Sequence, residues 1–390
     1  MREIRQAIVG IAAILLCMGI SVHSAAASTS DGSCSKPAQH AADSVVDVPD
    51  YATQADNANI AERSTEAARL WNSTIDSLSA SNNPRDWALA AFINLLPRDG
   101  VDRTQTAALA ARAAAAAPDD VLIQSMTLAA LDASSGADTS VAAQNLQVLE
   151  PDNAAAWMNS LNTAFANKDA TGVDVALEHM AAGNRFDLHY AAIASAVAEV
   201  YLRYPLAEQY RAQAQDQGWP GSDEDIALAM GSVSAAGFAL PAFQNLVLAC
   251  SIDPQTGKNV WRGPDCAHVG RLLAMHSNTL ISKKTGFALL RVSHTYTNQD
   301  VQNARELDWL RTSWVKLFAT DPADGSALAI AQMKDWIATG NEVESMRRGL
   351  VRAEYPVSPP ADWVDESSSF SAKRLQDDKR SADYRAAHSH

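Results

Sequence analysis

The feature that most constrains the fold is a short helix-breaking segment that recurs every 33 to 34 residues. Proline opens a polar triplet at residues 84–86, 118–120 and 151–153, and Arg-Phe-Asp occupies the next such position at 185–187. Proline cannot continue a preceding helix, and Asp or Asn beside it can accept hydrogen bonds from the free N–H groups of the next helix. Each triplet therefore predicts a boundary between two helices.

A second break falls near the middle of each unit, at residues 97–100, 134–138 and 167–172. All three breaks carry Gly and Asp, which favour turns. A period of about 34 residues with one internal turn indicates two antiparallel helices per unit. Neither helix can bury its apolar face alone, so neighbouring units must stack. The period therefore predicts an all-α fold.

One junction carries a family resemblance. Residues 151–157, Pro-Asp-Asn-Ala-Ala-Ala-Trp, resemble the inter-repeat junction of the tetratricopeptide (TPR) family. In the same unit, Trp157, Leu161 and Phe165 form the stripe of an inner helix, and apolar residues within 173–180 form that of an outer helix. The resemblance covers about residues 83–218, as three units and a fourth.

The repeats depart from the family pattern and are degenerate. The family expects a small residue at Leu161, and the unit that begins at Val121 lacks the Trp and Tyr positions. The resemblance implies a right-handed α-α superhelix, a TPR-like solenoid, whose concave side often binds peptides. We assign residues 59–221 to this repeat array.

After the break at residues 218–221 the period is lost, but helical spacing continues. We expect helices at about 225–250, divided by Gly231, Gly237 and Pro241, and at about 265–292, 298–319 and 325–354. Residues 222–355 then form a non-repeating helical C-terminal half. Residues 356–390 have three prolines, a serine cluster and mixed charges, which predicts a disordered tail.

The first 27 residues have the three parts of a secretory signal peptide. Arg2 and Arg5 precede an uncharged apolar run at 7–20, and three alanines at 25–27 offer a cleavage site before Ser28. The run is short for a membrane span, which needs roughly 20 residues. Lipidation at Cys17 is disfavoured because Leu16 precedes it. We expect a cleaved signal, a flexible leader at 28–58, and a periplasmic or secreted, water-soluble bacterial protein without a transmembrane segment.

Export makes the cysteines informative, because an oxidising compartment favours disulfide bonds. The mature chain would retain Cys34, Cys250 and Cys266. We predict a disulfide between Cys250 and Cys266, with Trp261 in the intervening loop packed back against the helices. Closing such a loop stabilises a fold by about 3 kcal/mol in the chain-entropy model. A zinc site needs four ligands, and only His268 lies near.

Composition and motifs exclude several function classes. A formal net charge of −14 disfavours nucleic-acid binding, which needs a basic surface. The sequence has no nucleophile elbow, zinc-protease helix motif, phosphate loop or Cys-x-x-Cys. It therefore singles out no catalytic residue, cofactor-binding residue or metal ligand. His268, Arg271 and His276 share one helix face and could bind a metal or an anion, although we favour a solvated face; His179 is interpreted as a packing residue.

Three functions remain, of which a structural or assembly accessory at the outer membrane is the weakest. The leading hypothesis is an exported helical-repeat protein that acts as an interaction or scaffold module of the cell envelope, with a protein or peptide partner. It rests on the repeat period and the missing catalytic motifs. The alternative is an envelope enzyme whose site lies between the repeat array and the C-terminal half.

Overall fold

The computed structural model describes residues 68–95, 103–134, 136–206, 210–211, 221–238, 241–320 and 322–363. Within these ranges the chain is helical and contains no strand, which confirms the predicted all-α class. The expected signal peptide and leader, with Cys17 and Cys34, lie outside the described residues. None of the helices that the structure describes is long and apolar enough to cross a membrane.

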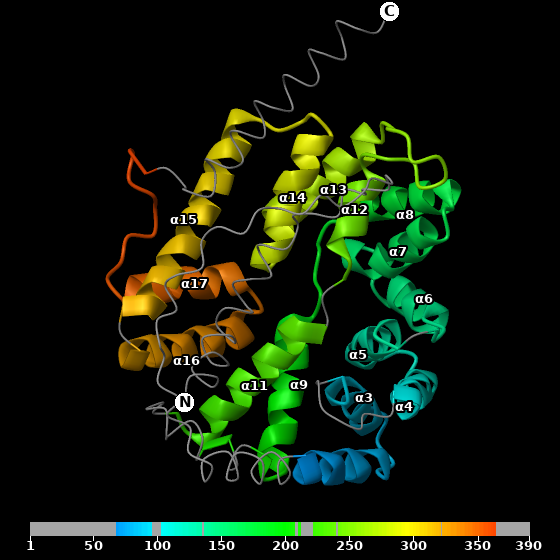
Figure 1. Ribbon diagram of the computed structural model, residues 1–390, viewed down its shortest axis with the longest axis vertical. Helices are drawn as coiled ribbons and strands as arrows, with labels where there is room; N and C mark the ends of the chain where they lie inside the picture. The colour runs from blue at the N-terminus through cyan, green and yellow to red at the C-terminus, as the bar shows by residue number, and fades with distance from the viewer. Residues whose placement is uncertain are drawn as a thin grey trace, which may run out of the picture.

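The region of the expected repeats forms a series of short helices, most of which pack against their neighbours in the sequence (Figure 1). A helix at residues 68–79 precedes them. The others are α3 (Pro84–Ile93), α4 (Arg103–Ala116), α5 (Val121–Asp132), α6 (Ser140–Leu149), the 3₁₀ helix η1 (Ala154–Trp157), α7 (Met158–Ala166), α8 (Ala170–Ala182) and α9 (Tyr190–Arg203).

Side chains at the predicted junctions cap these helices. Asp120 accepts a hydrogen bond from the N–H of Ile123 at the start of α5, and Asn153 accepts one from Ala155 at the start of η1. At the first junction Asn83 is the cap, immediately before Pro84. Asp86 instead pairs with Arg203, at 2.8 Å between Oδ1 and Nη1.

Helix α9 does not stack on the unit before it, as a fourth repeat would. It packs mainly along α11 (Asp223–Phe238) and also contacts α3, α5 and α16. Figure 1 shows α9 and α11 side by side, next to α3 and α5. The neighbours of α7 and α8 on that side are α12 and α13 from the C-terminal half.

The C-terminal half has more helix breaks than its apolar pattern predicted. Its helices are α11, α12 (Phe243–Ala249), α13 (Gly263–His276), α14 (Leu280–Val292), α15 (Asn298–Thr320), α16 (Pro322–Thr339) and α17 (Glu342–Arg352).

Two expected helices are each divided by a cap. Between α13 and α14, Thr279 accepts a hydrogen bond from the N–H of Ser282, which starts a new helix. Between α16 and α17, Gly340 has a φ of +66° and Asn341 caps α17 through the N–H of Glu344. Conversely, α11 runs through Gly231 and Gly237 and ends only before Pro241.

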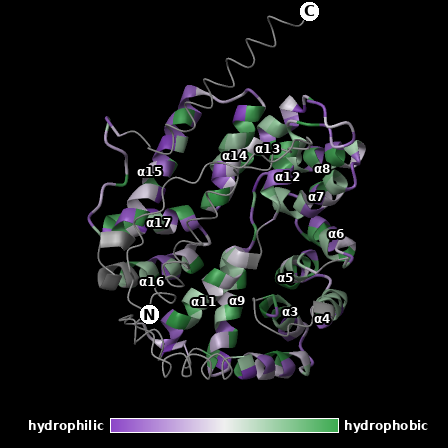
Figure 2. Ribbon diagram, viewed as in Figure 1, coloured by the Kyte–Doolittle hydropathy of each residue, from purple (hydrophilic) through white to green (hydrophobic). Residues whose placement is uncertain are grey.

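Three groups of buried side chains hold the described residues together. The first joins α3, α4 and α5 to α9 and α11, the second joins α7 and α8 to α12, α13 and α14, and the third joins α14, α15 and α17. Figure 2 shows α3 and α9 rich in apolar residues, whereas α17 is mostly polar. The expected boundary at residues 221 and 222 does not divide these cores, because two of them contain helices from both sides.

The start of the expected disordered tail packs on α15. Trp309 donates from Nε1 to the carbonyl of Pro356 at 2.9 Å, and its ring meets that of Trp363 edge to face. Arg305 also donates to the Trp363 carbonyl, at 2.9 Å. Residues 356–363 are therefore attached to the helical body, while residues 364–390 lie outside the described residues.

Candidate functional site

Two predicted junctions, one repeat apart, lie side by side. The carboxamide of Asn153 accepts the N–H of Asp187 at 2.9 Å and donates to the Asp187 carbonyl at 2.9 Å. The backbone N–H of Ala154 also donates to the carbonyl of Arg185. The side chain of Asn153 is 1% exposed, so these bonds form away from competing water. A residue expected only to cap a helix therefore also joins two successive units.

Glu150 is the centre of a charged cluster at this junction. Its carboxylate accepts hydrogen bonds from Arg185 Nη2 at 2.6 Å, His189 Nε2 at 2.7 Å and Asn153 Nδ2 at 2.9 Å. Burial of Glu150 acts to raise its pKa, but the hydrogen bonds from His189, Arg185 and Asn153 outweigh burial and lower the pKa to about 2. Glu150 is therefore a stably ionised carboxylate.

His189 faces carboxylates on both sides of its ring. Nε2 pairs with Glu150, and Nδ1 lies 3.7 Å from Asp187 Oδ2. Burial acts to lower the pKa of His189, but the hydrogen bond with Glu150 and the charge of Asp187 raise it overall. The backbone of His189 has a φ of +57°, and the backbone N–H of His189 donates a hydrogen bond to Asp187 Oδ1. Because both ring nitrogens face the chain's own carboxylates, we interpret His189 as a structural residue.

The same cluster reaches the C-terminal half. Asn278 donates from Nδ2 to Asp187 Oδ1 at 3.0 Å, and the Asn278 carbonyl accepts the N–H of Glu342. The carboxyl of Glu342 in turn accepts the N–H of Leu280 at 2.8 Å. Burial raises the pKa of Glu342 despite that hydrogen bond. Polar contacts thus connect the loop before α9 to the starts of α14 and α17.

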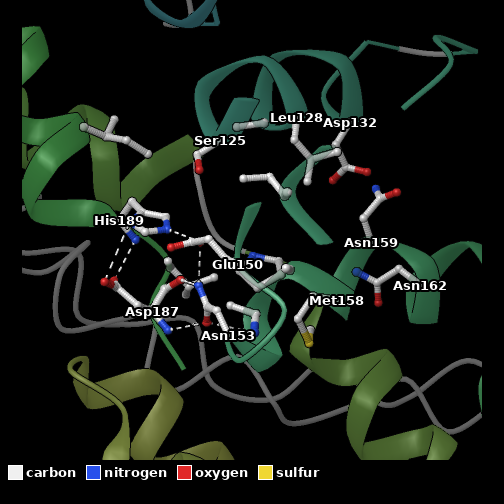
Figure 3. A pocket seen from close by; sticks show the side chains of 17 residues that line it. Ser125, Leu128, Asp132, Glu150, Asn153, Met158, Asn159, Asn162, Asp187 and His189 are labelled. Atoms are coloured by element: carbon white, nitrogen blue, oxygen red, sulfur yellow. Dashed lines mark hydrogen bonds and ion pairs between the residues drawn. The ribbon is translucent and has the colours of Figure 1, made fainter. Parts of the chain in front are cut away.

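A cavity of about 90 Å³ lies beside this cluster, and we call it the α5–α7 cavity. Glu150, His189 and Asp187 form one side, and Figure 3 shows Asp132, Asn159 and Asn162 on the opposite side. The rest of its wall is mostly apolar. These other lining residues are Ser125, Leu128, Ala129, Leu146, Asn153, Ala155, Ala156, Met158, Leu188, Ile193 and Pro241.

Several residues that line the α5–α7 cavity are separated by the interval of the predicted repeat. Ser125, Asn159 and Ile193 are each 34 residues apart, and Leu128 and Asn162 are separated by the same interval. The cavity therefore has lining residues from α5, η1, α7 and the start of α9.

A larger, open pocket of about 700 Å³ adjoins the cavity, and we call it the α6–α8 pocket. It shares Asp132 and Asn159 with the α5–α7 cavity. Its walls come from the α5–α6 loop and from α6, α7 and α8, and they carry hydroxyl, amide and carboxylate groups together with Trp157. No described residue that lines either hollow is a lysine or an arginine.

The predicted cysteine pair lies at bonding distance. The sulfur atoms of Cys250 and Cys266 are 2.04 Å apart, at facing ends of α12 and α13. Arg262 also fastens the loop, because it donates to the carbonyls of Ala249 and Ile252. The prediction for Trp261 was wrong: its side chain is 72% exposed. Arg262, which can form several directed hydrogen bonds, is the loop residue that turns inward.

The predicted polar cluster on α13 does not form an enclosed site. His268 and His276 are exposed, and Arg271 forms an ion pair with the buried Asp300 at the start of α15. Among the described residues no group of three His, Cys, Asp or Glu side chains could hold a metal ion. His179 stacks on Trp157 with ring centroids 3.8 Å apart, as expected for a packing residue.

Sequence reasoning did not single out Glu150, His189, Asp132 or Asn162. The available signal was the repeat itself: polar residues at Asn159 and Asn162 occupy the positions of Ser125 and Leu128 in the unit before. Glu150 and His189 carried no signal, because they are 39 residues apart and only folding brings them together.

Comparisons with family models, with curated proteins and with solved structures found no match for this chain.

Proposed function

We propose that this protein is an exported helical-repeat module that binds an extended segment of a partner protein in the α6–α8 pocket. The observation that carries the proposal is the pocket itself. Its volume of about 700 Å³ lies in the range of roughly 300–1,000 Å³ that is usual for ligand pockets. Its mixed hydroxyl and amide lining offers both donors and acceptors to a peptide backbone.

Two further observations support an exported binding module. The bonded pair Cys250 and Cys266 fits an oxidising compartment outside the cytoplasm. The hydrogen bonds of Asn153 hold two units in a fixed relation next to the pocket. A preorganised surface loses less entropy on binding than one that must first be ordered.

The alternative, an enzyme with a site between the repeat region and the C-terminal half, has less support from the geometry. Where these parts meet, Asp187, Asn278 and Glu342 bond to one another or to nearby backbone groups. His189 has both ring nitrogens directed at carboxylates. These groups are engaged in holding the fold, so we favour binding.

Selection from a random peptide library displayed on phage, with the mature chain as bait, tests the proposal. Binders are then measured on Thr163→Trp, which fills the pocket from an exposed position on α7, and on Ala115→Trp, an exposed position on α4 outside the lining. We expect affinity to fall at least about tenfold, or 1.4 kcal/mol, on Thr163→Trp alone. Binders that tolerate both variants equally, or a library that yields none, would contradict the proposal.

A further inference from the structure

The geometry points to a more specific ligand: the α5–α7 cavity receives one basic side chain, lysine or arginine, of the segment bound in the α6–α8 pocket. This inference rests on the proposed function, which it extends from a binding surface to a recognition rule. The two hollows share Asp132 and Asn159. A residue of a chain lying in the pocket can therefore direct its side chain past these two residues into the cavity.

The first argument is the position of Asp132. It is the last residue of α5, and the last turn of that helix contains no basic residue. A carboxylate is unfavourable there, because the carbonyl end of a helix is already negative. Asp132 is exposed at the edge that the two hollows share, and no described lysine, arginine or histidine forms an ion pair with it. A cation from outside would remove this unfavourable arrangement.

The second argument is a buried amide oxygen that has no hydrogen-bond partner within the described part of the chain. The Oδ1 atom of Asn162 is buried and accepts no hydrogen bond within the described part of the chain. Asn159 accepts a hydrogen bond from Thr139 at 3.1 Å, which fixes its orientation beside the opening. A buried polar atom without a partner is costly, so an N–H donor from a ligand would stabilise the complex. Ammonium and guanidinium groups supply such N–H donors. They also carry the positive charge that would pair with the Asp132 carboxylate.

The third argument is size. A cavity of about 90 Å³ holds about three water molecules at roughly 30 Å³ each, which matches the end of one long side chain and is too small for a drug-sized ligand. Its apolar wall, with Leu128, Met158 and Ile193, suits the aliphatic stem of lysine or arginine. A basic head with an apolar stem fits this lining better than an acidic or a small polar group.

The test uses the mature chain and two capped peptides, acetyl-Gly-Gly-Arg-Gly-Gly-amide and its analogue with citrulline, the neutral isostere of arginine. Affinity is measured by isothermal titration, and the side-chain amide signal of Asn162 is followed by NMR. We expect the arginine peptide to bind at least about tenfold more tightly than the citrulline peptide, and to shift the Asn162 signal.

Asp132→Asn should abolish that preference for arginine without weakening the fold, because it removes an uncompensated carboxylate. The matched control is Asp76→Asn, an exposed position on the first described helix, which should change nothing. Thermal unfolding checks that both variants are folded.

Three results would overturn the inference: equal affinity for both peptides, unchanged arginine binding by Asp132→Asn, or free methylguanidine that binds as tightly as the arginine peptide. The last would indicate a small cation as ligand. The proposed function can fail separately. Peptide selection could find no binder sensitive to Thr163→Trp while arginine binding still depends on Asp132. In that case the α5–α7 cavity does bind a basic side chain, and the proposal that an extended segment binds in the α6–α8 pocket is wrong.

Discussion

At the scale of single residues, the fold depends on polar side chains that serve more than one partner. Asn153 caps a helix, pairs with the backbone of Asp187 and donates to Glu150. Glu150 in turn holds Arg185 and His189. Cap residues such as Asn153 could be predicted from sequence because capping is local. Their second partners could not, because those contacts depend on how the units stack.

Glu150→Gln should lower the free energy of unfolding by about 2–3 kcal/mol near pH 6, because it removes the charge that Arg185 and His189 share. The loss is moderate because Arg185 is half-exposed. Urea denaturation measures it, with the exposed Glu178→Gln on α8 as the control. Equal stability of Glu150→Gln and the parent chain would show that the cluster does not hold the junction.

The same cluster predicts a pH dependence. The pKa of Glu150 is lowered to about 2, so its stabilising effect is present above its ordinary pKa of 4.5 and is lost as the pH falls toward 2. The pKa of His189 is raised, so its effect is present below 6.5 and is lost as the pH rises through the raised value. The difference in the free energy of unfolding between the parent chain and Glu150→Gln should therefore be greatest between about pH 4.5 and 6.5. Arg185, Asp152 and Asp187 are the other charged groups at this junction. A difference that stays constant from pH 3 to 8 would contradict this assignment.

At the scale of helices, the period predicted the breaks on either side of α5 and α7, because proline, Asp and Asn act within one turn. It did not predict the path of α9. Apolar spacing shows that a helix has a face to bury, but several neighbours can cover such a face. The missed break between α13 and α14 has a local cause, since Thr279 starts a helix inside a stretch that otherwise keeps helical spacing.

Gly231 and Gly237 in α11 provide a matched pair of substitutions. A Cβ atom at Gly231 would collide with the Ala194 carbonyl oxygen of α9, whereas one at Gly237 would meet nothing within 4 Å. Gly231→Ala should therefore destabilise the protein by about 1–3 kcal/mol, because two helices must separate. Gly237→Ala should stabilise it by about 0.5–1 kcal/mol. Thermal denaturation followed by circular dichroism measures both; the same sign for both would mean that α9 and α11 do not pack closely at Gly231.

Replacing Cys250 and Cys266 by serine should lower stability by about 2–4 kcal/mol, since the bond closes the connection between α12 and α13. Far-UV circular dichroism should barely change, because the bond does not make the helices. Urea titration of the double variant measures the loss. A large fall in helicity, or no change in stability, would contradict this role.

At the scale of the whole molecule, the C-terminal half covers the repeat region rather than following it. Helix α11 shares a core with α3, α4 and α5, and α13 packs on α8. The described parts of the two halves thus share two buried cores. The hollows between α5 and α8 remain open, with Asp132 at the edge that they share.

The most direct test of the account is photo-crosslinking in cells of the native host, with p-benzoylphenylalanine in place of Gln144, an exposed residue of α6 that lines the α6–α8 pocket. We predict an adduct with a partner protein, in which the cross-linked segment lies close to a lysine or arginine. The adduct should weaken strongly when Asp132→Asn is added, and the same probe at Ala115 should not form it. No adduct from Gln144, or the same adducts from Ala115, would contradict the claim that this pocket binds a partner.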